Sequence, residues 1–586
     1  MRAACLLLGL WAAVWAAQAP ESAHDPVLAA LEAELERSRA IRLAELEPPY
    51  FIQYTLEDVS GFSVAATLGA LIREDRPRFR VAGVEVRVGS YEFDNTNYAL
   101  ADLFGRAPAA LGVPLEDDEL ALRAYFWLAT DAAYKGALES IARKRAAVKH
   151  LGVYKATPDF WKAEPVRLLE PVSDRVPEAT GWPERVRELS SLFRDYPQID
   201  FSQVDYGANR TVSYLVNSEG ARIRYVDWVH WLQLRAEAQA SDGMPVRDVR
   251  TLVWPQPEDA PAPAALREAA LEVARMADAL RRAPPAENYV GPVLVEGIAA
   301  PQLLAQLLGR NLAAVRRPVG EPGRTPPIEP SEFEGRLGAR VLPEWLDVVD
   351  DPTQKEWRGQ RLLGFYRVDM EGVPPQPLTL IERGVLRAFL LTRQPVEGQT
   401  GSNGRARLPG PFGARSAGIS NLFVSASKTL TPAALRERLL EMVRQRSKPY
   451  GLVIRKLDFP ASGGLRELRR MALGARGRAS GGRLVSRPLL VWRLRPDGTE
   501  ELVRGLEFRN LSVRVLRDIV AASDESHLFE YLANTAPLSL AGAGGYVAGT
   551  SVVAPSLLFE ELELERSEEQ FPRPPLVPAP PLAARR

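Results

Sequence analysis

The sequence has almost no cysteine and little histidine, and both shortages limit the chemistry open to it. The single cysteine, Cys5, lies at the N-terminus, so a chain that loses its first residues has no disulfide, thiolate metal site or cysteine nucleophile. The four histidines, His24, His150, His230 and His527, stand far apart, and no two have the spacing of a metal-binding pair. The formal net charge is zero, with both signs interspersed, which gives no support for nucleic-acid binding.

Long hydrophobic runs are also missing, except at the N-terminus. Met1-Arg2 precedes an apolar run from Ala3 to Ala17, and small residues follow up to Ala19, which is the order of a secretory signal. The run is shorter than the ~20 apolar residues that a membrane-spanning helix needs. We therefore expect a signal peptide at residues 1–19 and export to the bacterial periplasm or the extracellular space. Cleavage after Ala16 is the alternative, and a retained signal would be a membrane anchor.

The order of helix-like and strand-like segments predicts an α+β fold. The chain has 586 residues, 46% of them apolar, which is enough for more than one domain. Helical patterns over 26–47 and 116–149 alternate with strand patterns over 50–88 and 212–234, and this block order favours an antiparallel sheet covered by helices. Four prolines within 254–263 indicate a break between two domains.

After this break, a helix over 263–281 leads into a second domain with strand-sized apolar pieces and more glycine and proline. This domain is expected to be mainly β, with helices only near 300–314, 432–446 and 513–522. The expected division is a signal peptide at 1–19, an N-terminal α+β domain at 25–250, a linker and helix at 251–285, a β-rich domain at 286–566 and a proline-rich tail at 567–586.

The segment from Val368 to Leu386 is the most distinctive part of the sequence. It predicts a strand, a Gly-Val-Pro-Pro turn and a hairpin through Glu382-Arg383-Gly384. The loop Gly401 to Arg407 and the triplet Ser420-Asn421-Leu422 follow it in order. Over about 285–565 this order resembles the TldD/PmbA family of metallopeptidases, also described as modulators of DNA gyrase. The resemblance implies a dimer with a cavity, between its two kinds of domain, that admits unfolded peptide.

The resemblance also implies a zinc-type metal site that this chain lacks. Peptidase members carry His-Glu-x-x-x-His on a helix near the start of the domain, and a later cysteine completes the site. Aligning Gly309 with the motif's glycine places Ala305 and Arg310 at the histidines and Gln306 at the glutamate. Alanine has no donor atom, arginine stays protonated, and glutamine cannot act as a general base. We therefore expect no metal, no other cofactor and no catalytic residue at these degenerate positions.

Other polar patterns favour structural roles. His230 alternates like a strand residue, and the sequence neighbours of His527, a serine and an acid, do not make a catalytic triad by adjacency alone. The acidic run Glu560 to Glu565 alternates with leucines and predicts an edge strand with a solvated face. The glycine-rich stretch 541–549 lacks the Gly-Lys-Ser/Thr ending of a phosphate-binding loop and predicts a tight loop that lines the family's cleft.

The loop with Asn403, Arg405 and Arg407 is the candidate for peptide binding, because guanidinium groups hold carboxylates and backbone carbonyls. A plain solvated loop is the alternative. The leading hypothesis is an exported pseudoenzyme of a metallopeptidase family. It would bind peptide or act as the non-catalytic subunit of a peptidase assembly, as a homodimer or as a heterodimer with a metal-bearing relative. An active peptidase with an unrecognised site and a structural cell-envelope protein are the alternatives, so the sequence leaves enzyme activity open.

Overall fold

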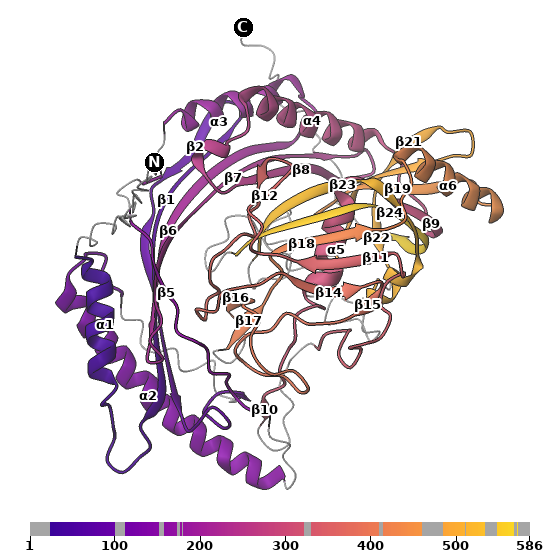
Figure 1. The fold of residues 1–586 in the computed structure, drawn as a ribbon. Helices are drawn as coiled ribbons and strands as arrows, with labels where there is room; N and C mark the ends of the chain where they lie inside the picture. The colour runs from indigo at the N-terminus through magenta and orange to yellow at the C-terminus, as the bar shows by residue number, and fades with distance from the viewer. Residues whose placement is uncertain are drawn as a thin grey trace, which may run out of the picture.

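The structure is a computed structural model that describes residues 24–99, 112–151, 157–172, 176–177, 180–320, 330–409, 414–459, 485–509, 511–533, 548–567 and 571. It is α+β, with two large sheets and with helices and small hairpins around them (Figure 1). The expected signal peptide, nearly all of the glycine-rich stretch 541–549 and nearly all of the proline-rich tail lie outside the described residues. No helix in the described part of the chain is both long and apolar enough to cross a membrane.

The N-terminal half forms a sheet of seven described strands, in the order β2-β1-β6-β7-β5 with β3 on β1 and β8 on β7. All neighbours are antiparallel except β5 and β7. The strands are β1 (Pro49–Thr67), β2 (Ala70–Asp75), β3 (Arg78–Val88), β5 (Arg167–Leu169), β6 (Phe201–Asn217), β7 (Arg222–Gln239) and β8 (Pro245–Trp254). The length of β1, β6 and β7 lets this sheet curve as an arch around the second half (Figure 1).

Four helices cover the outer face of the arch: α1 (Pro26–Ser38), α2 (Glu119–Leu151), α3 (Trp182–Ser191) and α4 (Pro263–Arg282). Helices α1 and α2 pack at one end of the arch, in a core with Tyr54 and Val212, and α3 and α4 pack at the other, in a core with Leu232 and Leu234. The helix expected over 263–281 is confirmed as α4, and the region expected as linker therefore holds the end of β8 and a helix that packs on the arch.

The first helix is shorter than expected. It begins as the sequence indicates, because Asp25 Oδ1 accepts the Leu28 amide at 3.0 Å and Pro26 occupies the first turn. It ends at Ser38 instead of residue 47, and Ala44 has a φ of 48°, which a right-handed helix does not permit.

The C-terminal half contains an eleven-stranded sheet in the described residues, with the order β15-β14-β11-β18-β24-β9-β19-β20-β21 and with β22 and β23 on β24. The strands are β9 (Tyr289–Val295), β11 (Leu346–Asp350), β14 (Leu378–Glu382), β15 (Val385–Leu386), β18 (Asn421–Ala426), β19 (Gly451–Leu457), β20 (Pro488–Leu494), β21 (Glu500–Val503), β22 (Leu506–Phe508), β23 (Ile519–Ala533) and β24 (Ala548–Arg566). Small two-stranded sheets pair β4 (Tyr98–Ala99) with β10 (Val319–Gly320), β12 (Glu356–Trp357) with β13 (Gln360–Arg361), and β16 (Ala406–Pro409) with β17 (Arg415–Ala417).

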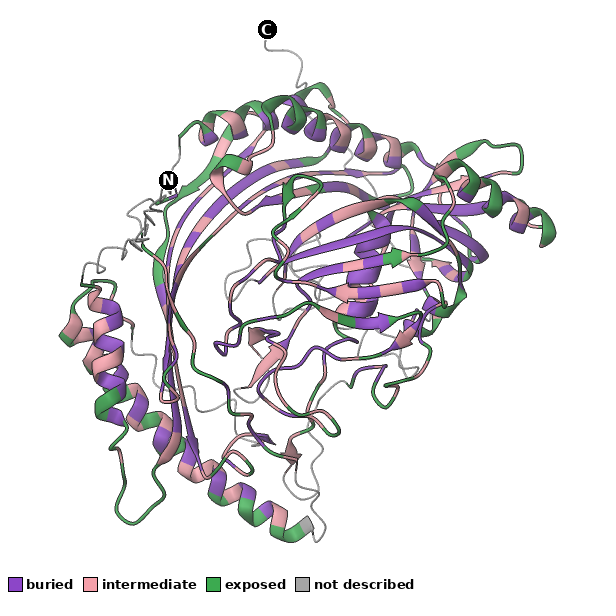
Figure 2. Cartoon of the chain, viewed as in Figure 1, coloured by how far each residue is buried: buried purple, intermediate pink, exposed green. Residues whose placement is uncertain are grey.

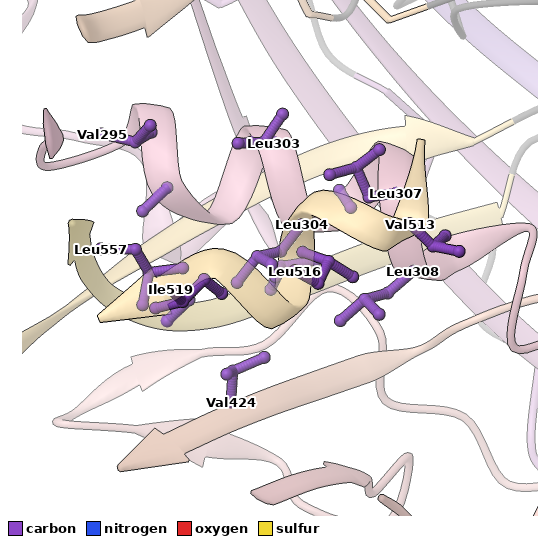
Figure 3. Close-up of a cluster of buried hydrophobic side chains, with 14 of the residues drawn as sticks. Val295, Leu303, Leu304, Leu307, Leu308, Val424, Val513, Leu516, Ile519 and Leu557 are labelled. Atoms are coloured by element: carbon purple, nitrogen blue, oxygen red, sulfur yellow. The ribbon is translucent and has the colours of Figure 1, made fainter. Parts of the chain in front are cut away.

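Two helices pack on opposite faces of this sheet, as the alternation along β9 shows. Val293 and Val295 belong to the core with α5 (Ala299–Gly309), and Leu294 belongs to the core with α6 (Pro432–Gln445). Figure 3 shows the leucines of α5 against side chains from β18, β24 and the segment after residue 512.

Two local predictions for this half need correction. The short helix expected near 513–522 is present as a 3₁₀ helix (Val513–Asp518), but it ends before residue 519, where β23 begins and Ile519 pairs with Phe559. The acidic run Glu560 to Glu565 is not an edge strand, because its last residues lie in β24 between β9 and β22: Glu563 pairs with Val290 and Glu565 with Glu507.

Two small apolar clusters join the two halves on the inner face of the arch, and a further cluster packs Leu489 and Leu490 against residues of β7 and β8. In the first, Val368 packs with Leu215 and Ile223. In the second, Leu363 and Leu532 pack with Val253. The helices lie on the outer face, so the inner face of the arch is turned toward the C-terminal sheet (Figure 2).

Candidate functional site between the two halves

Polar side chains occupy the middle of the inner face of the arch. Along β6 the outward residues Arg210 and Val212 are buried, while the inward residues Asn209, Thr211 and Ser213 are half-buried. This alternation is the normal period of a strand, but the inward positions here are polar instead of apolar.

Strand register brings three ionisable side chains onto the same part of this face. Glu57 of β1 lies opposite Ser213, and Ser213 lies opposite Tyr225 of β7. Asp227 lies one inward position farther along β7, opposite Thr211. Since side chains two residues apart in a strand share a face, Glu57, Tyr225 and Asp227 all point toward the C-terminal half.

A loop of the C-terminal half crosses these residues. Its two ends are the apolar contacts already described, Leu363 at one and Val368 at the other. Between them, the Tyr366 hydroxyl donates to the Gly404 carbonyl at 2.5 Å, and an Arg367 Nη1 lies 3.7 Å from Asp227 Oδ1.

The hairpin β16–β17 supplies two more guanidinium groups. Arg407 lies over the Tyr366 ring, 4.2 Å from its centroid, and donates to the carbonyl of Gly549. Burial raises the pKa of Glu57, and the positive charge of Arg415, at the start of β17, opposes part of this rise. We call this set the interdomain polar site, and its members are Glu57, Tyr225, Asp227, Arg367, Arg407 and Arg415.

Both carboxylates of the site hold protons more tightly than usual. Burial, together with the charge of Asp227, raises the pKa of Glu57 to about 7. Burial also raises the pKa of Asp227, although Arg367 and Arg407 oppose the rise, and the pKa of Tyr225 is raised for the same reason. Yet the side chain of Asp227 is 57% exposed.

Much of the hydrogen-bonding capacity of this face is unused. Within the described ranges, Glu57, Asn209 and Thr211 make no hydrogen bond or ion pair with another residue, and Asp227 makes only its contact with Arg367. Carboxylates with a raised pKa, next to unused polar groups, are able to hold a cation or to exchange a proton.

The three predicted peptide-binding residues are separated by the structure. The amide of Asn403 accepts from the Leu391 N–H and donates to the Phe389 carbonyl, both at 2.8 Å. Arg405 is fully buried, and its Nε donates to Asp350 Oδ1 at 2.7 Å. Both side chains therefore fix the loop, and only Arg407 reaches the interdomain polar site.

The degenerate motif positions lie on or at the end of α5, and they do not fit a zinc ion. Ala305 is buried and has no donor atom. Gln306 is engaged by the protein, since its Oε1 accepts from the Ser486 N–H at 2.8 Å and from the Ser486 hydroxyl at 2.9 Å. Arg310, at the end of the helix, is exposed and cationic. No group of three His, Cys, Asp or Glu side chains placed to hold a metal occurs in the described parts of the chain.

Arg310 is nevertheless close to the interdomain polar site. The charges of Arg310 and Arg407 both act on Tyr531 of β23, whose pKa is raised mainly by burial. The end of α5 and the interdomain polar site therefore share a neighbour.

A second group of carboxylates supports the distinctive Val368 to Leu386 segment. Asp369 accepts three backbone N–H bonds, from Glu371, Val373 and Ala406, and Glu371 accepts the Arg393 N–H at 2.6 Å. Burial raises the pKa of Asp369 to about 6 and that of Glu371 to about 7. These hydrogen bonds fix the turn that carries Tyr366 and Arg367 relative to β16.

The histidines lie outside this site. His230 is on the outer face of the arch, where its Nδ1 is 3.0 Å from the Tyr206 hydroxyl and its ring stacks on Trp254. His527 is on β23, and burial lowers its pKa. The hydroxyl of Ser523 accepts the Glu525 N–H at 3.1 Å, so this serine serves the local backbone.

Sequence reasoning missed Glu57, Asp227, Arg367 and Arg415. One signal was available for the first two, since an acidic residue at an inward position of a long strand is costly unless it serves a site. No local signal identified the two arginines, because their role depends on where the loop and the hairpin lie against the arch.

Comparisons with known proteins agree with the fold and identify the second half. Over most of its length the chain shares the two-domain α+β fold of two solved structures. One is a Thermotoga maritima protein proposed as a modulator of a DNA gyrase, with a TM-score of 0.56 and 14% identity over 88% of this chain and 96% of that one. The other is TldE from Thermococcus kodakarensis, with a TM-score of 0.52 and 12% identity over 92% of this chain and 100% of that one.

The family follows from the sequence matches. Residues 295–457 match the model of the PmbA/TldA metallopeptidase C-terminal domain. A metalloprotease of Archaeoglobus fulgidus is 36% identical over 78 residues, which are 13% of this chain and 17% of the relative. A metalloprotease of Methanocaldococcus jannaschii is 34% identical over 79 residues, 13% of this chain and 16% of the relative. The matched segment thus spans about a sixth of these curated relatives. Residues 295–457 thus form a C-terminal domain of the metallopeptidase-related PmbA/TldD type.

Proposed function

We propose that this chain is an exported member of the PmbA/TldD family that binds peptides without hydrolysing them by itself. It would act as the non-catalytic subunit of a peptidase assembly, paired either with a second copy of itself or with a metal-bearing relative. The observation that carries the proposal is a contrast within one region. Ala305, Gln306 and Arg310 provide no metal ligand and no general base, while the neighbouring interdomain polar site keeps polar side chains with unused hydrogen-bonding capacity.

A peptide is the ligand that this capacity suits. An extended peptide offers an alternating series of N–H donors and carbonyl acceptors. On the arch, Asn209 and Thr211 are able to both donate and accept, and Glu57 and Asp227 are able to accept. On the opposite side, the Nε of Arg407 is buried and has no acceptor among the described residues. A peptide carbonyl would satisfy it.

The test uses the purified full chain after exposure to zinc, with elemental analysis beside peptide-binding and peptide-hydrolysis assays, each with and without chelator. The proposal expects substoichiometric metal, no cleavage, and peptide binding that the chelator does not change. One tightly held metal per chain with chelator-sensitive cleavage would overturn it. Fractionation of the native host and N-terminal sequencing of the recovered chain test export, and a host fraction that is entirely cytoplasmic would contradict that part.

A further inference from the structure

The unused groups of the interdomain polar site are mostly acceptors. Glu57 has no hydrogen bond or ion pair within the described residues. Asp227 keeps 57% of its side chain exposed, and its one contact, with Arg367, is 3.7 Å long. The charge of Asp227 adds to the rise in the pKa of Glu57 that burial causes. A donor placed between them would relieve this repulsion.

The guanidinium groups of the site are largely committed. Arg367 forms a short ion pair with Glu170, which leaves Asp227 only its outer contact. Arg407 stacks on Tyr366 and donates to the Gly549 carbonyl, and its Nε alone lacks an acceptor. Arg415 has partners of its own. The three guanidinium groups therefore have contacts within the protein, while among the described residues Glu57 accepts no hydrogen bond and Asp227 has only the 3.7 Å contact with Arg367.

From this imbalance we propose that the ligand of the interdomain polar site is a basic peptide, with a lysine or arginine side chain between Glu57 and Asp227 and a backbone carbonyl on Arg407. This inference rests on the proposed peptide-binding function and specifies its ligand class. An ammonium or guanidinium supplies only donors, which is what the two carboxylates lack. The strands and the loop that carry these residues are held by strand register and by the apolar contacts at Leu363 and Val368, so the site is formed before the ligand arrives.

The test compares three labelled peptides with capped ends. They are identical except for one central residue, which is lysine, glutamine or glutamate. Binding to the full chain is measured by fluorescence anisotropy at fixed salt. The lysine peptide is expected to bind about tenfold more tightly than the glutamine peptide, and the glutamate peptide more weakly than both. The variants Glu57→Gln and Asp227→Asn are each expected to remove most of the lysine preference. The matched control is Glu45→Gln, at a 99% exposed carboxylate, which should leave it unchanged.

The pH dependence of the lysine preference distinguishes binding at this site from general charge attraction. Glu57 faces Asp227, Tyr225 and Arg415, and burial raises its pKa to about 7. The lysine preference should therefore grow several-fold between pH 6 and pH 8 in the wild type and stay flat in Glu57→Gln. Both variants remove a carboxylate that folding already disfavours in its charged form, so they should fold.

The outcomes distinguish the two proposals. Equal binding of all three peptides overturns the basic ligand and leaves peptide binding in place. A preference for the glutamate peptide also overturns it and assigns the site to the arginines. No binding by any of the three contradicts the proposed function itself.

Discussion

Replacing Arg405 by methionine is expected to destabilise the C-terminal half strongly, although sequence reasoning placed this arginine in a binding loop. Its guanidinium is fully buried and makes bonds in several directions. The Nε donates to Asp350 Oδ1 at 2.7 Å, Nη2 donates to the carbonyls of Gln376 at 2.7 Å and Asp350 at 3.1 Å, and Nη1 donates to the Asn403 carbonyl at 2.5 Å. Methionine fills a similar volume and replaces none of these bonds.

The magnitude follows from the charge that remains. Removing one partner of a buried ion pair typically costs about 3–5 kcal/mol, because the other charge stays buried without its counterion. Ser420 still donates to Asp350 through its amide and its hydroxyl, both at 2.7 Å, which keeps the loss within this range. The double variant with Asp350→Asn should be more stable than Arg405→Met alone, since no buried charge is left.

The matched control is Arg407→Met, two residues farther along the chain. Arg407 is half-buried and contacts the Tyr366 ring and the Gly549 carbonyl, so a loss of about 1 kcal/mol or less is expected. Equilibrium urea unfolding gives the free energies, and hydrogen exchange resolved by peptide assigns the loss to the C-terminal half. A loss below about 1 kcal/mol for Arg405→Met, or a larger loss for Arg407→Met, would refute the reasoning.

Three further predictions concern stability. Lys144→Met should cost about 3 kcal/mol in urea unfolding, because the buried ammonium lies 2.5 Å from Asp159 Oδ2; an unchanged midpoint would contradict this. Gly384→Ala should cost more than Gly359→Ala in thermal melts: both have φ near +80°, but a Cβ at 384 would lie 2.2 Å from a carbonyl oxygen and one at 359 meets open space. Burial raises the pKa of Glu530 to about 7, so the folded state binds a proton between pH 4.5 and 7 that the unfolded state releases. That contribution to stability is present below this window and is lost as pH rises through it, and Glu530→Gln should flatten the melting temperature between pH 5 and 8.

Local patterns predicted the elements that local physics decides. The helices over 263–281 and 432–446 were readable because each begins with a proline, carries an apolar stripe at helical spacing and ends before a break. The strands around 50–72 and 212–234 were readable from their alternation. What the pattern did not give was length: β1 runs through Gly61 as one strand, because pairing with β6 holds the chain extended there.

Predictions failed where distant pairing decides the outcome. The acidic run at 560–565 carries the alternation of an edge strand, and only β9, far earlier in the chain, makes it an inner one. The roles of Arg405 and Arg407 could not be separated from sequence, because Asp350, the partner of Arg405, lies 55 residues away. Arg405 lies just before β16 and Arg407 lies within it, and the buried guanidinium of Arg405 bonds to Asp350 while that of Arg407 stacks on Tyr366.

The residues of the interdomain polar site are positioned by other contacts than those that hold α5. Helix α5 is held by its leucines and by the hydrogen bonds between Gln306 and Ser486. Glu57 and Asp227 are placed by the register of β1, β6 and β7, and the loop above them is fixed at its apolar ends. Substitutions at positions 305, 306 and 310 therefore change α5 without moving the strands and the loop that position Glu57 and Asp227. If the interdomain polar site binds peptide, placing histidines at positions 305 and 310 should leave the affinity for a basic peptide within about twofold of the wild-type value. A larger loss would show that α5 and the site are coupled.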